Sequence, residues 1–258
     1  RRSRFSVCLR HKQSKSTFML IVFVMLVACQ SFENQDRKYP STIGTFNDTG
    51  NFTINPTTIL DTLNRGEINV FTPSLATPSA DTILPSGSIH WTQSDYLKIA
   101  NALSQFVWKE TLEDWKVYSI LFERECHENP SGFDSLDIIY YKTIKVNSQK
   151  AYTAHYIQIY PLASNVTWGG ETNFPISNGW NGIDLKKLKI SADDALRIAE
   201  ENGGKEARSR VQNDCLILTK VPSHNNDDSW DVYYYPGVYF ELLINPYSGK
   251  YEMPTPSP

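Results

Sequence analysis

Carboxylates are the side chains of this 258-residue chain whose spacing comes closest to acid–base chemistry. Glu123, Glu125 and Glu128 lie close together, and two carboxyl groups at a suitable separation can act as a general acid and a general base. Alternation along a strand offers another explanation, in which Glu123 and Glu125 share one exposed face. We expect the second explanation, so the sequence predicts no catalytic residue and no enzyme.

The five histidines are scattered and form no spacing typical of a metal site: His11, His90, His127, His155 and His224. Neither a His-x-x-x-His nor a Cys-x-x-Cys pair occurs, and phosphate-loop and dinucleotide motifs are also missing from the sequence. The ligand-rich run that begins at His224 is expected to be a solvated hairpin connection. We therefore expect no metal and no cofactor. A cleft that gathers His155 or His127 with carboxylates would instead indicate an enzyme.

The charge balance argues against a nucleic-acid partner. The formal net charge is -3, and binding phosphates needs a concentrated positive field. At 40% hydrophobic residues the chain can build a sizeable core. A folded domain that binds no nucleic acid is therefore expected.

Residues 1–28 are typical of a secretory signal peptide. The first 15 residues are basic with no acidic residue, and an apolar run, FMLIVFVMLVAC, follows at residues 18–29. This run is too short to span a bilayer, which needs roughly 20 apolar residues. A basic flank followed by a short apolar run predicts export.

The apolar run ends in Leu-Val-Ala-Cys at residues 26–29, which resembles the bacterial lipobox. In that motif the cysteine becomes the lipid-modified first residue of the mature protein. The resemblance implies that Cys29 anchors the chain to a membrane, on its extracytoplasmic side, because several acyl chains together give stable anchoring. The alternatives are an ordinary signal peptide, or a buried strand, with a chance cysteine.

Residues 29–88 are expected to form the lipidated N-terminus and a flexible linker. Asn, Thr, Ser and Pro dominate this segment, and such a composition cannot bury enough apolar surface to offset its ordering entropy. A weak apolar pattern at residues 59–71 allows a short helix or strand packed against the domain. Residues 253–258 are expected to be a disordered tail.

A unit that occurs twice begins near residue 89. TQSDYLKIAN at residues 92–101 aligns with SADDALRIAE at residues 191–200, and each starts like a helix capping box. Strand-like runs follow each helix, and the middle runs are nearly identical, DSLDIIYY and DSWDVYYY. The sequence therefore predicts an α+β fold of two tandem α-β-β-β units, each a helix packed on a small antiparallel sheet. The predicted boundaries are 89–180 and 181–252.

Alternation in these two middle strands separates two faces of each sheet. One face should pack on the helix, and the other carries Tyr141, Tyr233 and Tyr235. This second face is too apolar for a plainly solvated surface. Either the two sheets join into one continuous layer, or the three tyrosines form a candidate partner-binding face.

Cys126 and Cys215 fall one in each unit. In the oxidising compartment that export implies, they are a candidate disulfide joining the two units. Two separate buried thiols are the alternative, since free cysteines often lie in cores.

The second unit resembles the PepSY domain family. The match lies in the helix start at Ile190 and Ser191, the WDVYYY strand, and the closing NPYSG at residues 245–249, where Asn replaces the commoner Asp. The first unit lacks the closing motif. The pair of units is also similar to bacterial proteins that grip secreted β-lactamases on a sheet. The PepSY resemblance implies a non-catalytic extracytoplasmic module that binds or restrains a protein, and it carries over no functional residue.

The sequence as a whole predicts an envelope-anchored lipoprotein that binds or regulates an envelope or secreted protein, for example by restraining a peptidase. A structural lipoprotein without a discrete binding site is one alternative, and an enzyme with a site between the two units is another. Exposure of Tyr233 and Tyr235 would favour a binding module, and burial would favour the structural role.

Overall fold

The computed structural model describes residues 46, 48–74, 89–126, 132–176, 182–210, 215–223, 227–235 and 240–254. All of them belong to one compact unit, Gly44–Pro258. The candidate lipidation residue Cys29 and the expected signal peptide lie outside the described residues. So do several other residues considered above: His11, His127, Glu128 and His224.

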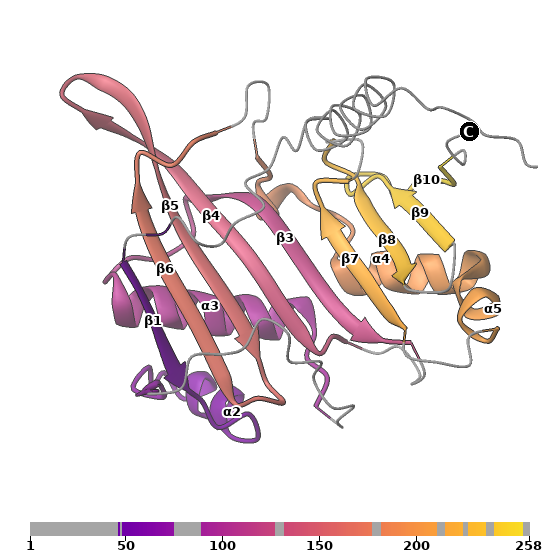
Figure 1. Ribbon diagram of the computed structural model, residues 1–258, viewed down its shortest axis with the longest axis horizontal. Helices are drawn as coiled ribbons and strands as arrows, with labels where there is room; N and C mark the ends of the chain where they lie inside the picture. Colours follow the sequence, from indigo (N-terminus) through magenta and orange to yellow (C-terminus); the bar gives the residue numbers. More distant parts are fainter. Residues whose placement is uncertain are drawn as a thin grey trace, which may run out of the picture. The chain divides into compact units, whose positions relative to one another are not determined.

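The strands of the described residues form one ten-stranded sheet (Figure 1). Their order across the sheet is β10-β9-β8-β7-β3-β4-β5-β6-β1-β2. The strand bounds are β1 Asp48–Thr53, β2 Thr72–Pro73, β3 Lys116–Glu125, β4 Ser135–Val146, β5 Gln149–Tyr160, β6 Asn165–Thr172, β7 Leu216–Val221, β8 Trp230–Tyr235, β9 Phe240–Ile244 and β10 Tyr251–Glu252. All neighbouring pairs are antiparallel.

The prediction of two units, each with its own small sheet, is wrong. Strand β3 of the first predicted unit pairs directly with β7 of the second, from Ile120 opposite Val221 to Glu125 opposite Leu216. Two separate sheets would each leave an edge of unpaired backbone N–H and C=O groups, and joining the edges satisfies both. The boundary predicted near residue 180 therefore does not divide the strands into two sheets.

A disulfide reinforces the seam between β3 and β7. It joins Cys126 to Cys215, whose Cα atoms are 5.3 Å apart. The backbone N–H of Cys126 also donates to the carbonyl of Cys215 at 2.9 Å. The structure therefore brings the two candidate disulfide cysteines together where the predicted units meet.

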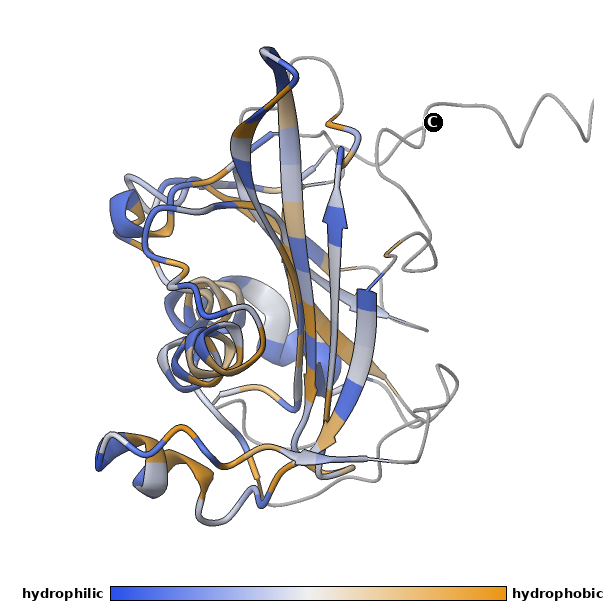
Figure 2. Ribbon diagram, turned by 90° about the vertical axis from the view of Figure 1, so that its left-hand side faces the viewer, coloured by the Kyte–Doolittle hydropathy of each residue, from blue (hydrophilic) through white to orange (hydrophobic). Residues whose placement is uncertain are grey.

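The longest helices of the described residues lie on one side of the sheet (Figure 2). Helix α3 lies against the half of the sheet that contains β4 and β5, and α4 contacts β7, β8 and β9. The helix bounds are α2 Ile59–Asn64, α3 Gln93–Val107, η2 Leu185–Lys187, α4 Ala192–Ala199, η3 Glu200–Gly204 and α5 Lys205–Arg208.

Helices α3 and α4 begin where the sequence predicts. The Thr92 hydroxyl accepts from the backbone N–H of Asp95 at 3.3 Å, and the Asp95 carboxylate accepts from the backbone N–H of Thr92 at 3.0 Å. Ser191 and Asp194 repeat the arrangement for α4. Each box satisfies backbone donors that the first helical turn leaves without partners.

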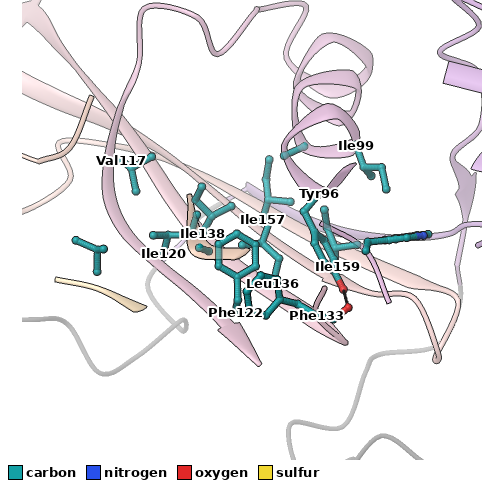
Figure 3. Packing of buried hydrophobic residues seen from close by; sticks show 14 of the residues in the cluster. Tyr96, Ile99, Val117, Ile120, Phe122, Phe133, Leu136, Ile138, Ile157 and Ile159 are labelled. Atoms are coloured by element: carbon teal, nitrogen blue, oxygen red, sulfur yellow. Dashed lines mark hydrogen bonds between the residues drawn. The ribbon is translucent and has the colours of Figure 1, made fainter. Parts of the chain in front are cut away.

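The core lies between the helices and the sheet (Figure 3). Tyr96 and Ile99 of α3 are fully buried, and the Tyr96 hydroxyl donates to the Phe133 carbonyl at 3.0 Å. The sheet contributes alternate residues of its central strands: Ile120, Phe122, Leu136, Ile138, Ile157 and Ile159. The same alternation leaves every second residue of these strands for the opposite face of the sheet.

Residues 48–74 do not belong to a flexible linker, contrary to the sequence prediction, although a short helix does form within residues 59–71, where the apolar pattern allowed one. They form β1, α2 and β2, and β1 pairs with β6 along its full length. The polar composition led to the wrong prediction of a linker, because a strand needs few apolar residues when only one of its faces is buried. Phe52 and Phe71 supply that burial, with ring centroids 5.5 and 5.6 Å from that of Phe106.

The outermost strands of the sheet are short. β2 and β10 have two residues each, and β2 ends in Pro73. Short edge strands and proline are common devices against edge-to-edge pairing. The faces of the sheet are therefore better suited than its edges to bind a partner.

Candidate protein-binding face

The face of the sheet opposite α3 and α4, here called the second face, carries a row of aligned side chains. Strand pairing places them side by side across eight strands: Leu243, Asp231, Lys220, Leu121, Asp137, Gln158, Thr167 and Asn51. A neighbouring row contains Glu241, Tyr233, Leu218, Glu123 and Ser135. These two central rows extend over both halves of the sheet, so the two predicted sheets join into one continuous layer, which was one of the two alternatives for this face.

Asp137 of β4 is the centre of a hydrogen-bonded network in these rows. Gln158 Nε2 donates to Asp137 Oδ2 at 3.0 Å, and the Tyr160 hydroxyl donates to Asp137 Oδ1 at 3.4 Å. Partial burial of the carboxyl group, with Glu123 nearby, raises the pKa of Asp137 to about 7. The network therefore holds a carboxyl group that gains and loses its proton near neutral pH.

Glu123 lies diagonally across from Asp137 on the adjacent strand β3. Diagonal neighbours of an antiparallel pair are roughly 7 Å apart, so the two carboxyl groups interact electrostatically. Ser135 Oγ donates to Glu123 Oε2 at 3.3 Å, but burial outweighs this bond and raises the pKa of Glu123. Having both carboxyl groups ionised at the same time therefore costs free energy.

Lys220 is the one lysine in the two central rows. Its Nζ lies 3.6 Å from Asp231 Oδ2 and 4.9 Å from the centre of the Tyr233 ring. Four acidic side chains share these rows with it: Glu123, Asp137, Asp231 and Glu241. The two central rows therefore contain more acidic than basic side chains.

The predicted partner-binding tyrosines all lie on the second face, but not together. Tyr235 is 61% exposed and Tyr233 is partly exposed, whereas Tyr141 is only 5% exposed. Tyr141 packs edge-on against the rings of Tyr118 and Tyr152. It is six residues along the strand and three strands across from Tyr233, a separation of roughly 25 Å. Tyr141 is therefore not part of one site with the other two.

His155 lies on the helix side of the sheet, away from Glu123. Its ring is sandwiched between the rings of Trp108 and Trp115, at centroid distances of 3.6 and 4.2 Å. Burial, assisted by the positive charge of Lys142, lowers the pKa of His155 to about 3. A neutral imidazole stacked between two indoles is a packing element, and the carboxylates of the second face lie on the opposite side of the sheet.

A histidine–carboxylate pair that the sequence did not suggest joins His90 to Asp134. His90 Nδ1 and Asp134 Oδ1 are 2.7 Å apart, and Asp134 Oδ2 accepts from the backbone N–H of Glu125 at 2.9 Å. These bonds connect the segment before α3 to the ends of β3 and β4. The pair therefore fixes a junction between strands. No local sequence pattern predicts it, because 44 residues separate His90 from Asp134.

One pocket of about 170 Å³ lies on the helix side, where the two predicted units meet. Its walls are Leu97, Asn101, Leu112, Glu113, Trp115, Tyr140, Asp184, Leu185 and Lys186. Ligand pockets usually measure about 300 Å³ or more. The pocket and the carboxyl pair lie on opposite faces of the sheet, so they do not combine into one active site.

The comparisons with known proteins assign no family to the chain. No family model, no curated protein and no solved structure matches it. The PepSY resemblance therefore gains no support.

The described residues contain neither a metal-binding cluster nor a helix that could span a membrane. None of their His, Cys, Asp and Glu side chains gather in a group of three that could hold a metal ion. Among the same residues, no helix combines the length and the apolar character needed to cross a membrane.

Proposed function

We propose that this chain is a non-catalytic lipoprotein, anchored through Cys29 on the extracytoplasmic side of a membrane, that binds a protein partner on its second face. The observation that supports this function is the pair formed by Glu123 and Asp137 in rows that extend over both halves of the sheet. The sheet thus offers one continuous surface, and not two small ones.

The partner presents a basic segment to this surface. Carboxyl groups with raised pKa values are poorly stabilised by the protein alone, and a nearby cation favours their ionised forms. Tyr233 and Tyr235 lie toward one end of the same surface, and tyrosine is enriched in protein interfaces. A secreted peptidase is the partner class that the PepSY resemblance implies.

The competing function is a structural lipoprotein without a discrete binding site. It is favoured by the low exposure of two second-face tyrosines, Tyr141 at 5% and Tyr156 at 3%. Tyr156 stacks on Phe46, with ring centroids 5.5 Å apart. In this alternative the second face is a packing surface and the carboxyl pair has no partner.

Affinity capture from envelope extract separates the two functions. The bait is the full chain, and the test variant is Glu123→Gln/Asp137→Asn, which removes both ionisable carboxyl groups with little change of shape. Glu201→Gln/Glu206→Gln is the matched control, because it removes two exposed charges on the helix side of the sheet. Circular dichroism establishes that all three proteins are folded.

Binding on the second face predicts a protein that the parent and the control retain and the test variant loses. Retention should also weaken as the pH falls below about 7, because Asp137 then takes up a proton and the attraction to a basic segment declines. Equal retention by all three baits, or a loss with the control alone, would contradict binding of a partner on the second face.

A further inference from the structure

The hairpin of β4 and β5 extends beyond the strands that flank it. β3 pairs with β4 no farther than Tyr141, and β6 pairs with β5 no farther than Thr153. The pairing of β4 with β5 continues alone to Val146 opposite Gln149. Residues 142–152, here called the ribbon, therefore project from the sheet as two strands (Figure 1).

The turn of the ribbon is tight. Asn147 and Ser148 have φ angles of +49° and +65°, as the two central residues of a type I′ turn require. Such a turn fits the twist of the flanking strands and fixes their register. The ribbon is therefore a defined projection with two distinct sides.

One side of the ribbon is cationic. Lys145 and Lys150 are direct cross-strand partners, an arrangement in which like charges destabilise the strand pair. Residues 142–152 contain no acidic residue, although the chain as a whole has a net charge of -3. Lys150 lies over the Tyr152 ring, 5.1 Å from its centre, but no acidic residue of the ribbon balances the two charges. An external anion that binds the ribbon would account for this arrangement.

The other side of the ribbon is mainly aliphatic. Alternation places Ile144, Val146 and Ala151 there, each partly exposed, with Gln149 beside the turn. Lys142 lies on the same side at the base of the ribbon, where it pairs with Glu110 and lies over the Trp115 ring. A segment with lysines on one side and aliphatic residues on the other has the pattern of elements that lie in a membrane interface. An acidic protein would neutralise the lysines but leave the aliphatic side in water, whereas an anionic bilayer accommodates both.

We propose that the ribbon binds the surface of an anionic phospholipid membrane, with Ile144 and Val146 in the acyl boundary and Lys145 and Lys150 at the headgroups. This inference rests on the membrane location in the proposed function, where the ribbon supplies a second contact beside the lipid on Cys29. It uses no residue of the second face, so either proposal can fail alone.

A fluorescent probe on the ribbon tests the contact directly. The full chain carries Cys8→Ser and Cys29→Ser, so it has no lipid, and Ser148→Cys provides the attachment point at the turn. The matched probe uses Ala163→Cys, in the turn at the opposite end of β5. Each labelled protein is mixed with vesicles of phosphatidylcholine alone, vesicles that also contain phosphatidylglycerol, or soluble polyglutamate.

The ribbon probe should shift its emission to shorter wavelength with phosphatidylglycerol vesicles only, and the probe at residue 163 should not shift. Each lysine near an anionic surface contributes roughly fivefold in affinity, so Lys145→Glu/Lys150→Glu should weaken the response more than tenfold. Lys186→Glu/Lys187→Glu, on η2, should leave it unchanged. A water-like emission from the ribbon probe on phosphatidylglycerol vesicles, or a response to polyglutamate alone, would overturn the inference.

Discussion

Gln93 and Asp193 each cap the other's helix across the boundary between the two halves of the molecule. Asp193 Oδ2 accepts from the backbone N–H of Gln93 at 2.9 Å, and Gln93 Oε1 accepts from the backbone N–H of Ala192 at 2.6 Å. The amino-terminal ends of α3 and α4 therefore meet, although about 100 residues separate them in the chain. This contact joins the halves on the helix side, as β3 and β7 join them in the sheet.

Replacing Gln93 by methionine should destabilise the protein by about 1 to 2 kcal/mol, because the buried backbone N–H of Ala192 loses its acceptor while the side-chain volume is kept. Urea unfolding measures the loss. Gln149→Met, at an exposed position of the ribbon, is the control and should change stability by less than about 0.5 kcal/mol. Equal effects of the two substitutions would contradict a capping role for Gln93.

Removing the disulfide with Cys126→Ser/Cys215→Ser should cost about 2 to 5 kcal/mol, because the bond closes a loop across 89 residues in the unfolded chain. Unfolding should nevertheless remain one cooperative transition, since the β3–β7 pairing persists without the bond. The measurement is urea unfolding followed by both tryptophan fluorescence and circular dichroism. Two separated transitions in the variant would show that the halves are independent domains.

The difference in stability between the parent and Asp137→Asn should depend on pH in a defined direction. The folded-state pKa of Asp137 is raised to about 7, so the folded protein binds the proton more tightly than the unfolded chain does. The parent therefore loses stability as the pH rises from about 4 through 7. An asparagine does not ionise, so the variant should gain about 1 to 2 kcal/mol on the parent above pH 7, an amount discounted for partial solvent contact.

Urea unfolding of the parent and Asp137→Asn on both sides of pH 7 checks this expectation. Asp61→Asn, on an exposed position of α2, serves as the control and should show no such gain. A constant difference between the parent and Asp137→Asn at all pH values would mean that Asp137 does not titrate near neutrality.

His155 should make the protein sensitive to acid. Its folded-state pKa is lowered to about 3, so its contribution to stability is present above the unfolded value and is lost as the pH falls from about 6.5 toward 3. His155→Phe keeps a flat ring between Trp108 and Trp115 but cannot be protonated. It should recover about 2 to 3 kcal/mol relative to the parent near pH 4.

At pH 7 the same variant should match the parent closely, which provides the internal control. Thermal or urea unfolding at both pH values yields the comparison. A His155→Phe protein that loses stability in parallel with the parent on acidification would show that the acid sensitivity has another source.

Local signals in the sequence were sufficient for the two long helices. The capping residues Thr92 and Ser191 are recognisable because a cap and its helix lie within a few residues of each other. Joining of the two sheets was one of the two alternatives that their apolar faces allowed. Its register was not predictable, because the pairing of Leu121 with Lys220 links positions 99 apart and no local pattern specifies it. The apolar pattern at residues 59–71 allowed a short helix, and α2 forms there. Strand β1 was missed because composition does not reveal a strand that buries only one face.

The sequence predicted on which face of the sheet the candidate site lies, but not which residues form it. Alternation assigned Tyr141, Tyr233 and Tyr235 to the face away from the helices, and the structure places them there. The register across β3, β4 and β5 decides that Glu123, Asp137 and Gln158 meet while Tyr141 lies far away. Register depends on the whole sheet, so the carboxyl pair could not be read from the sequence.

Photocrosslinking from the centre of the second face tests the central claim most directly. A photoreactive benzoylphenylalanine replaces Leu121, which is partly exposed between Lys220 and Asp137, or replaces Lys186 on the helix side. Both proteins are irradiated in intact envelopes. A protein partner on the second face predicts one defined adduct from position 121, weakened by Glu123→Gln/Asp137→Asn, and none from position 186. An adduct from position 186 alone, or none from position 121, would contradict it.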